Sequence, residues 1–337
     1  GNLTRLVDPL GRETRNVYGA FDLLRETVDA TGAAYRIAYD GDARPVAITN
    51  PLGETATLTW DRNGRLIAET DFGGRSWTYL RDAAGRMIER HEPDGDIRRF
   101  SYDEADRLIA EETASGIRRY GWDAAGRPVR AEEGGHVTEW RHDALGRVVA
   151  EIQDGLEVAI SHAGAGPRSR VTTPWGATGF TWDPAGRLKG LTAGPGALAF
   201  SFDALGRETL RQDPQGFTLA QSHDPAGRLT GQRVTGGADG RAVVDRRWRW
   251  DVAGQPVAIS DARWPEQRFT YDGRGQITRA LPGRPQGSAQ VEAFVYDAAR
   301  NLAGRGRDLP DGAETTAARP HPPADTAPPA GLDRWRL

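Results

Sequence analysis

The sequence contains no cysteine, and Lys189 is its single lysine among 337 residues. Without cysteine there is no disulfide, no thiolate metal site and no cysteine nucleophile, and the redox compartment is not indicated. No run of about 18 apolar residues occurs, which excludes a membrane-spanning helix.

The net charge is also small, because 44 basic and 47 acidic residues leave a net charge of −3. This balance gives no electrostatic reason to expect nucleic acid or an anionic membrane as a partner. The chain begins at Gly1 with neither an initiator methionine nor a signal peptide. We therefore expect a piece of a longer protein, with its export signal elsewhere.

What the sequence does contain is one short pattern, repeated along almost the whole chain. An aromatic residue, Asp, two variable residues, Gly, Arg and an aliphatic residue appear first in full as residues 60–66. Aligned on the Asp, fourteen registers run from Gly19 to Asp297, at steps of 20 or 21 residues as far as Asp224. Self-similarity at such a period is typical of repeat architectures, in which each unit contacts mainly its neighbours.

The residues that define the repeat are assigned a structural role. Asp caps a turn, Gly supplies a positive φ, Arg bonds to the Asp or to a neighbouring turn, and the aliphatic residue starts the next strand. The clearest copies are Trp60, Asp61, Gly64, Arg65, Asp82, Gly85, Arg86, Trp122, Asp123, Gly126, Arg127, Asp143, Gly146, Arg147, Trp182, Asp183, Gly186, Arg187, Asp203, Gly206 and Arg207. We call each turn begun by such an Asp a main turn.

A second turn is predicted about halfway between successive main turns, and we call it a tip turn. Asp or Asn first, Pro second and Gly fourth favours a type I turn. The tip turns predicted on this basis are residues 29–32, 50–53, 71–74, 92–95, 113–116 and 213–216.

Between the turns, large residues alternate with period two, as in Tyr35, Ile37 and Tyr39. This spacing puts side chains on one face of a strand and cannot form one face of a helix. Each period is therefore a β-hairpin of about 20 residues. On the order of 28 strands follow, and an open sheet rarely exceeds about ten strands without curling. The fold class predicted is all-β: tandem hairpins wound into a curled or spiral sheet.

Two segments are expected. Residues 1–305 form the repeat segment, and residues 306–337, which are rich in proline, form a linker or an irregular C-terminal segment. The register at Ala163 is interpreted as a decayed repeat, and residues 236–240 as a longer hairpin tip.

The recurring motif and its turns resemble the YD repeats of the RHS family, over roughly residues 1–305. The resemblance implies a hollow β-shell like that of RHS polymorphic toxins, teneurins and toxin-complex C components. It also implies a toxin domain encoded after the shell, secretion or delivery components as partners, and export from a bacterial cell or display at its surface. Bacterial members usually close the shell with an Asp-rich self-cleaving segment, and residues 333–337 do not match it.

The alternative is an extracellular repeat scaffold, adhesin-like, whose exposed aromatics bind cell-surface glycans or a protein. Aromatics facing neighbouring hairpins favour the shell, and aromatics facing solvent favour the scaffold. Metal sites at residues 91–96 and 40–42 were weighed against plain surface turns, which are favoured because neither has the ligands of an EF-hand loop. His142, His162 and His223 stand where other copies carry an aromatic. We expect no catalytic, cofactor or metal site, and no enzyme activity.

Overall fold

A computed structural model describes residues 1–236, 240–281 and 291–307. The fold consists of β-hairpins joined end to end, and the described residues contain 29 strands and one short 3-10 helix. All recorded strand pairs are antiparallel and join neighbours in the sequence, such as β12 with β13 and β13 with β14. The predicted all-β class of tandem hairpins is confirmed.

The chain divides into two compact units. Unit 1 comprises residues 1–58, 70–75 and 267–337, and unit 2 comprises residues 59–69 and 76–266. The chain therefore leaves unit 1 after Leu58, re-enters it for Thr70–Arg75, and returns to it again at Gln267.

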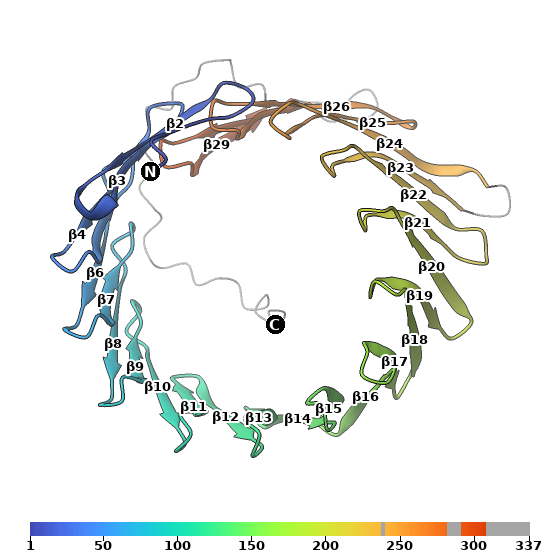
Figure 1. Cartoon of the computed structure of the whole chain (residues 1–337), viewed down its shortest axis with the longest axis horizontal. Helices are drawn as coiled ribbons and strands as arrows, with labels where there is room; N and C mark the ends of the chain where they lie inside the picture. Colours follow the sequence, from blue (N-terminus) through green and yellow to red (C-terminus); the bar gives the residue numbers. More distant parts are fainter. Residues whose placement is uncertain (237–239, 282–290, 308–337) are drawn as a thin grey trace. The chain divides into compact units, whose positions relative to one another are not determined.

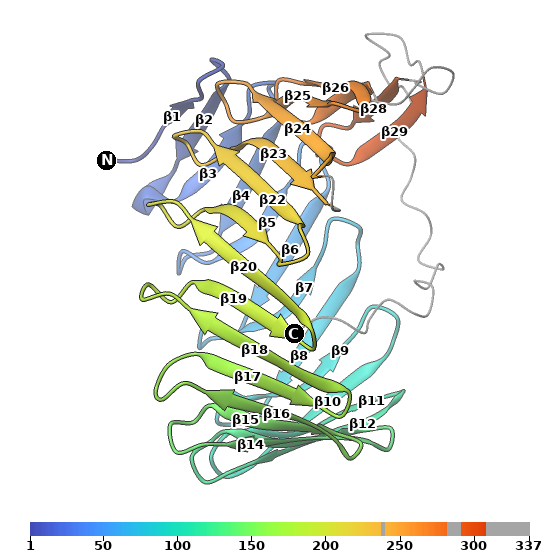
Figure 2. The ribbon, with the colours of Figure 1, turned by 90° about the vertical axis from the view of Figure 1, so that its right-hand side faces the viewer.

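Unit 1 holds the first and last strands, with unit boundaries falling inside β6, β7 and β26. Its elements are β1 Arg5–Val7, β2 Glu13–Tyr18, η1 Ala20–Asp22, β3 Leu24–Val28, β4 Ala34–Tyr39, β5 Pro45–Thr49, β6 Thr55–Trp60, β26 Trp264–Tyr271, β27 Ile277–Leu281, β28 Glu292–Tyr296 and β29 Leu302–Arg307. In Figures 1 and 2 the blue strands belong to the start of the chain and the orange-red ones to its end.

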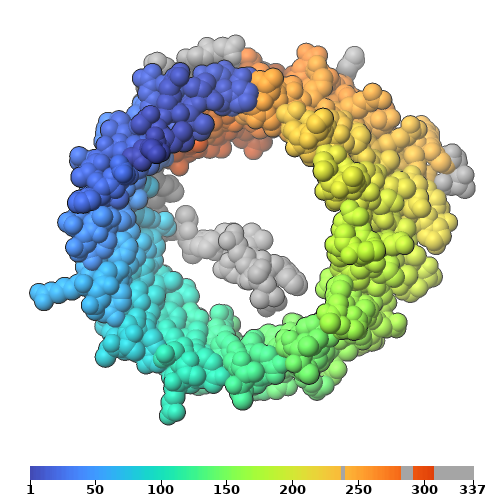
Figure 3. Space-filling model, viewed as in Figure 1, coloured from blue at the N-terminus to red at the C-terminus, as the bar shows by residue number. Residues whose placement is uncertain are grey.

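Unit 2 is a continuous series of hairpins along a curved path (Figure 1). Its strands are β7 Leu66–Thr70, β8 Ser76–Arg81, β9 Met87–His91, β10 Ile97–Tyr102, β11 Leu108–Thr113, β12 Gly116–Trp122, β13 Pro128–Glu133, β14 His136–His142, β15 Val148–Gln153, β16 Leu156–His162, β17 Arg168–Thr173, β18 Gly176–Trp182, β19 Leu188–Ala193, β20 Gly196–Phe202, β21 Glu208–Gln212, β22 Thr218–His223, β23 Leu229–Thr235, β24 Ala242–Trp250 and β25 Pro256–Asp261. Main turns and tip turns lie at opposite ends of these strands (Figure 2). In the space-filling view of this unit, each colour touches the colours next to it in the sequence (Figure 3).

The sheet is one layer thick, and it has almost no buried core. Among the described residues the buried apolar side chains are Ala150, Leu219, Ala258 and Ala293. Strand β6 alternates exposed and half-buried residues, with the half-buried face formed by Ala56, Leu58 and Trp60. Because no second layer covers this face, cohesion must come from contacts between neighbouring hairpins.

The change of period from 21 to 20 residues has a structural cause at the tip turns. In the hairpin of β5 and β6, five residues separate the paired Thr49 and Thr55. In the hairpin of β11 and β12, two residues separate the paired Thr113 and Gly116. The longer strands beside a two-residue tip recover two of the three residues lost. The net loss is one residue per period.

The reversal predicted at residues 113–116 is present, but it is a two-residue hairpin turn and not the longer turn of the other predicted tips. Thr113 cannot accept two backbone N–H groups as the carboxylate of Asp29 or Asp71 does, and its hydroxyl contacts Ser115 and the Gly116 carbonyl instead. Two-residue hairpins match the twist of the flanking strands. The tip at residues 236–240 and the segment 306–337 fall largely outside the described residues, although β29 continues to Arg307.

Candidate functional site

The candidate site is the row of main turns, since the repeated residues gather there. In the turn after β12, Oδ1 of Asp123 accepts hydrogen bonds from the backbone N–H groups of Ala125 (2.9 Å) and Arg127 (3.0 Å). Gly126 donates to the Asp123 carbonyl at 3.0 Å and has a φ of 78°. The carboxylate thus holds the turn closed, and the glycine adopts a backbone conformation that other residues rarely take.

The arginine of each motif joins two turns. Nε of Arg127 donates to Oδ2 of Asp123 at 2.6 Å, and Nη1 donates to the carbonyl of Asp143 in the next main turn at 3.1 Å. The same forward bond runs from Arg107 to the Asp123 carbonyl at 2.8 Å. We call this row of bonds the turn ladder. Further forward bonds come from Arg187, Arg207 and Arg228 to the next turn Asp, and from Arg147 to the Gly164 carbonyl.

The aromatic residue of each motif reaches in the opposite direction. Nε1 of Trp122 donates to the carbonyl of Leu108 at 2.8 Å, which is the first strand residue after the preceding main turn. Trp182 and Trp250 make the same bond to Arg168 and Leu229, and the hydroxyl of Tyr102 bonds the carbonyl of Met87. In these repeats the hairpin is therefore tied backward by its aromatic, and most of them are also tied forward by the Arg.

Stacking of an arginine on the aromatic ring also joins neighbouring hairpins, both where the ring has no polar atom and where it makes a hydrogen bond as well. The guanidinium of Arg187 lies over the ring of Phe202, 5.1 Å from its centroid. Arg86 and Arg228 stack in the same way on Tyr102 and Trp250 of the next hairpin. Cation–π pairs at such sites are worth about 0.5–1 kcal/mol each.

Histidine serves in the aromatic position as the sequence predicted. His142, His162 and His223 end strands β14, β16 and β22. A ring nitrogen of His162, Nε2, lies 3.1 Å from the carbonyl of Val148, which is the position bonded by the tryptophans.

The structure places the named site residues as follows. Trp60, Trp122 and Trp182 are the last residues of β6, β12 and β18. The six aspartates begin turns closed by the six glycines, whose φ values lie between 77° and 91°. Each arginine pairs with the Asp four residues before it: Arg65, Arg86, Arg127, Arg147, Arg187 and Arg207. They lie side by side along one edge of the hairpins, one set per repeat.

The electrostatics of these turns favour charged carboxylates. Hydrogen bonds from the backbone and the guanidinium of Arg127 lower the pKa of Asp123 below its usual value. The guanidinium of Arg147 has the largest effect at Asp143, whose pKa is also lowered. Carboxylates held in this state accept hydrogen bonds, which is what capping of the turn requires.

Ion pairs also connect neighbouring strands. Arg98 contacts Glu92 at 2.9 Å and Glu111 at 3.2 Å, and Arg118 contacts Glu111 at 3.6 Å and Glu133 at 2.7 Å. These pairs run from the tip turn after β9 to β13 and add lateral contacts between hairpins. No group of three or more His, Asp or Glu side chains that could hold a metal occurs in the described ranges.

The decayed repeat keeps its turn without the carboxylate. Gly166 donates to the carbonyl of Ala163 at 2.8 Å, and Arg147 from the previous turn donates to the carbonyls of Gly164 and Gly166. The turn ladder therefore reaches the copy that lost its Asp, in which Pro167 occupies the position of the arginine.

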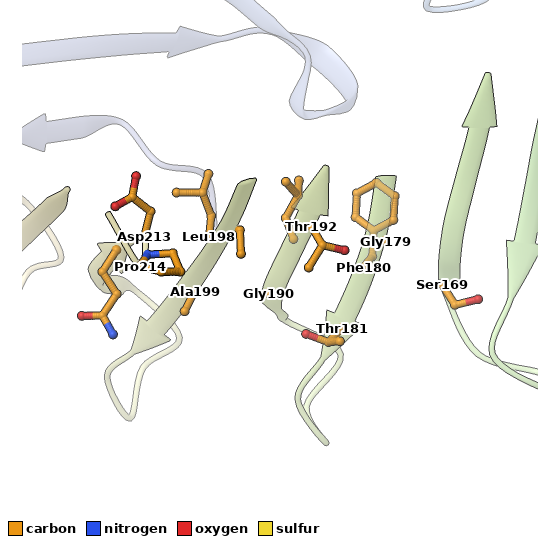
Figure 4. A pocket seen from close by; sticks show the side chains of 13 residues that line it. Ser169, Gly179, Phe180, Thr181, Gly190, Thr192, Leu198, Ala199, Asp213 and Pro214 are labelled. Atoms are coloured by element: carbon orange, nitrogen blue, oxygen red, sulfur yellow. The ribbon is translucent and has the colours of Figure 1, made fainter. Parts of the chain in front are cut away.

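One groove of about 430 Å³ lies on unit 2, across β18, β19 and β20 (Figure 4). Glycine opens it: a Cβ on Gly179 would lie 2.6 Å from Oγ1 of Thr192, and one on Gly190 would lie 2.7 Å from Oγ1 of Thr181. The carboxylate of Asp213 at its rim caps its own tip turn by accepting from Gln215 and Phe217. The groove brings together no set of residues suited to catalysis.

Comparison with known proteins agrees with this architecture. A sequence model of the family described as RHS Repeat matches residues 39–76, 60–97 and 102–132. Toxin protein Tse5 of Pseudomonas aeruginosa is 35% identical over 160 residues, which cover 44% of this chain and 12% of Tse5. Residues 39–97 and 102–132 therefore carry RHS repeats, and the chain resembles the RHS/YD-repeat family. It spans about an eighth of the length of Tse5.

Solved structures with the RHS-type fold are also similar to this chain. The crystal structure of TcdB2-TccC3 superposes with a TM-score of 0.77 at 17% identity, covering 89% of this chain and 20% of that one. The Photorhabdus luminescens Tc holotoxin pore gives a TM-score of 0.76 at 18% identity, covering 90% and 19%. At these identities the likeness extends to the fold alone. No helix in the part of the chain that the structure describes is long and apolar enough to cross a membrane.

Proposed function

We propose that this chain is a structural segment of an RHS-type toxin and forms part of a hollow β-shell. The shell encapsulates, and helps to deliver, a C-terminal toxin domain that lies outside this chain. The observation that carries the proposal is a one-layer sheet held by the turn ladder, in which neighbouring hairpins are tied through Arg127 to Asp143 and Trp122 to Leu108. Such a one-layer sheet can form the wall of a shell.

The direction of the aromatics favours the shell over a binding scaffold. The polar atoms of Trp122, Trp182 and Trp250 are used on backbone carbonyls of the preceding hairpin. Side chains used in this way are not free to recognise a sugar. The relatives support the same choice, since Tse5 is named as a toxin and the solved structures are toxin complexes.

The partners in this proposal are the toxin domain and the components that export it. The protein is secreted or exported from a bacterial cell, or displayed at its surface. The segment itself has no catalytic activity, because its repeated carboxylates and guanidinium groups are engaged in turns.

Limited proteolysis of the longer natural protein, with its C-terminal domain, tests the proposal. The C-terminal domain should resist cleavage while the repeats are intact. Replacing Arg127 and Arg187 by Gln should loosen neighbouring hairpins and make that domain accessible. A matched control, Arg15→Gln, changes an exposed arginine that pairs with Glu13 and takes no part in the turn ladder. A C-terminal domain cleaved equally fast in all three proteins would contradict encapsulation.

A second candidate function is recognition of a glycan or protein, and one residue favours it. Trp175 lies in the two-residue tip between β17 and β18, and 81% of it is exposed. A glycan array should compare the chain with Trp175→Ala and with the double variant Trp60→Ala/Trp122→Ala. Binding lost in either variant would support the scaffold, whereas no binding at all is the outcome expected for a wall.

A further inference from the structure

The repeat is altered at one main turn in unit 1, between β26 and β27. The segment Asp272–Gln276 carries Arg at the third position and Gln at the fifth, where most copies carry Arg. The turn itself is unchanged: Asp272 donates to the Gln276 carbonyl at 2.9 Å, and Gly275 has a φ of 81°. The turn keeps its shape, but its arginine stands two positions earlier than in most copies. The side chain therefore starts from a different part of the turn backbone.

From this position Arg274 reaches the beginning of the chain. Its Nε lies 2.9 Å from Oδ2 of Asp29 and 2.6 Å from Oγ1 of Thr31, across 243 positions in the sequence in the latter case. Its Nη1 donates to the carbonyls of Asp297 and Ala298 at 3.0 and 3.1 Å. The same side chain therefore continues the turn ladder and contacts a tip turn of the first hairpins.

The tip turn at Asp29 is altered in the complementary way. Oδ1 of Asp29 accepts from the backbone of Thr31 and Ala33, so the turn is capped as usual. The residue four positions on is Ala33, whereas Asp71 has Arg75, whose Nε donates to its Oδ2 at 2.7 Å. Ala33 offers no guanidinium to Oδ2 of Asp29, and the guanidinium of Arg274 contacts this oxygen instead.

Burial and fit indicate a built contact. The side chains of Arg274 and Asp29 are 11% and 17% exposed, less than those of Arg75 and Asp71 at 63% and 28%. A Cβ on Gly273 would lie 3.3 Å from Cγ2 of Thr31, so the backbone approaches closely at this point. Arg300 adds a weaker contact to Asp29 at 3.7 Å. Charge-assisted hydrogen bonds in partly buried positions are among the stronger side-chain contacts.

We propose that Arg274 and Asp29 form an ionic latch that seats the last hairpins of the described chain on the first ones. The latch consists of side-chain contacts, whereas the recorded strand pairs on either side, β3 with β4 and β26 with β27, run between sequence neighbours. The two ends can therefore part at the latch without losing a strand pair. This inference concerns unit 1 by itself and does not depend on the proposed function.

Hydrogen exchange measured on the whole chain by mass spectrometry tests the latch. Arg274→Gln should speed exchange of amides in residues 24–39 about tenfold, because a charge-assisted bond to a distant segment is lost. Asp29→Asn keeps the Oδ1 cap and should give the same change in residues 264–281. The double variant should exchange no faster than either single variant, since both remove one interaction.

Arg228→Gln is the matched control. Arg228 makes the same forward bond, to the Asp251 carbonyl at 2.9 Å, but it pairs with Asp224 in its own turn. Its loss should change exchange only in the hairpins around it. Arg274→Lys, which keeps the charge, should fall between wild type and Arg274→Gln. Unchanged exchange in residues 24–39 of the Arg274→Gln protein, or additive effects in the double variant, would overturn the latch.

Discussion

The fourth position of the main turn offers a test of the backbone argument. Gly126 occupies it with a φ of 78°, and Ala43 occupies it with a φ of 64°. Both positions are exposed, and both residues donate to the carbonyl of the turn Asp, at 3.0 Å from Gly126 and 3.2 Å from Ala43. The two turns thus differ mainly in whether a Cβ is present.

The magnitude follows from two opposing terms. A residue with a Cβ is strained by roughly 1–2 kcal/mol in the left-handed conformation. Replacing it by glycine removes this strain but costs about 0.4–1 kcal/mol through the freedom of the unfolded chain. Ala43→Gly should therefore stabilise its turn by about 0.5–1 kcal/mol, and Gly126→Ala should destabilise its turn by a similar amount. No atom lies within 4 Å of a Cβ on Gly126, so a clash does not contribute.

Hydrogen exchange is the suitable assay, because a repeat array can open locally without unfolding as a whole. Exchange near residues 38–47 should slow about two- to fivefold in Ala43→Gly, and exchange near residues 120–130 should speed up by the same factor in Gly126→Ala. Asp106 has a φ of 62° and also accepts from Arg86, so Asp106→Gly should gain less than Ala43→Gly. If Ala43→Gly exchanged faster than wild type, the strain argument would be refuted.

Three further predictions concern the turn ladder. Arg127→Gln should speed exchange in its own hairpin and in the next, near residues 140–150, because its Nη1 bonds the Asp143 carbonyl; a change confined to its own turn would contradict the forward bond. Trp122→Phe should lower the local stability by about 1 kcal/mol, because the hydrogen bond to the Leu108 carbonyl is lost. Faster amide exchange near residue 108 would show this loss. Phe200→Tyr, which lies outside the motif position, serves as the control. The lowered pKa values of Asp123, Asp183 and Asp203 mean that their stabilisation is present above the ordinary value of 3.8 and is lost as pH falls through the lower native pKa. The urea midpoint should therefore hold from pH 7 to about 5 and decline below about 4, and a midpoint that rises on acidification would show the sign to be wrong.

Most of the local structure could be predicted from the sequence, because the residues that form the turns recur in many copies of the repeat. Asp, Gly and the alternating aromatics each have one physical reason to occur where they do, so the hairpins, the main turns and their bonds to Arg could all be predicted. The histidines at 142, 162 and 223 could be interpreted correctly from register alone. A single copy of the motif would not have allowed this.

Other features could not be predicted, because they depend on which segments meet in space. The forward reach of Arg127 and the backward reach of Trp122 have no signature beyond the motif itself. The turn at residues 113–116 was predicted but its two-residue form was not, although the shortened period indicated a loss of residues. The contact of Arg274 with Asp29 was missed. Its signal was an arginine displaced by two positions, which looks like decay until the partner turn is seen.

The backward bond of the aromatic and the forward bond of the Arg give the array a direction along the chain. The same direction affects the order in which hairpins can assemble during synthesis. A hairpin that has just left the ribosome carries an aromatic that can bond the hairpin before it, and an Arg whose acceptor has not yet been made. Each unit can thus be added to a surface already formed, and the contacts it needs lie within about 20 residues of chain. Hairpins would then be added to the sheet one after another during synthesis. The contact between Arg274 and Asp29, which joins residues 245 positions apart, can form only at the end.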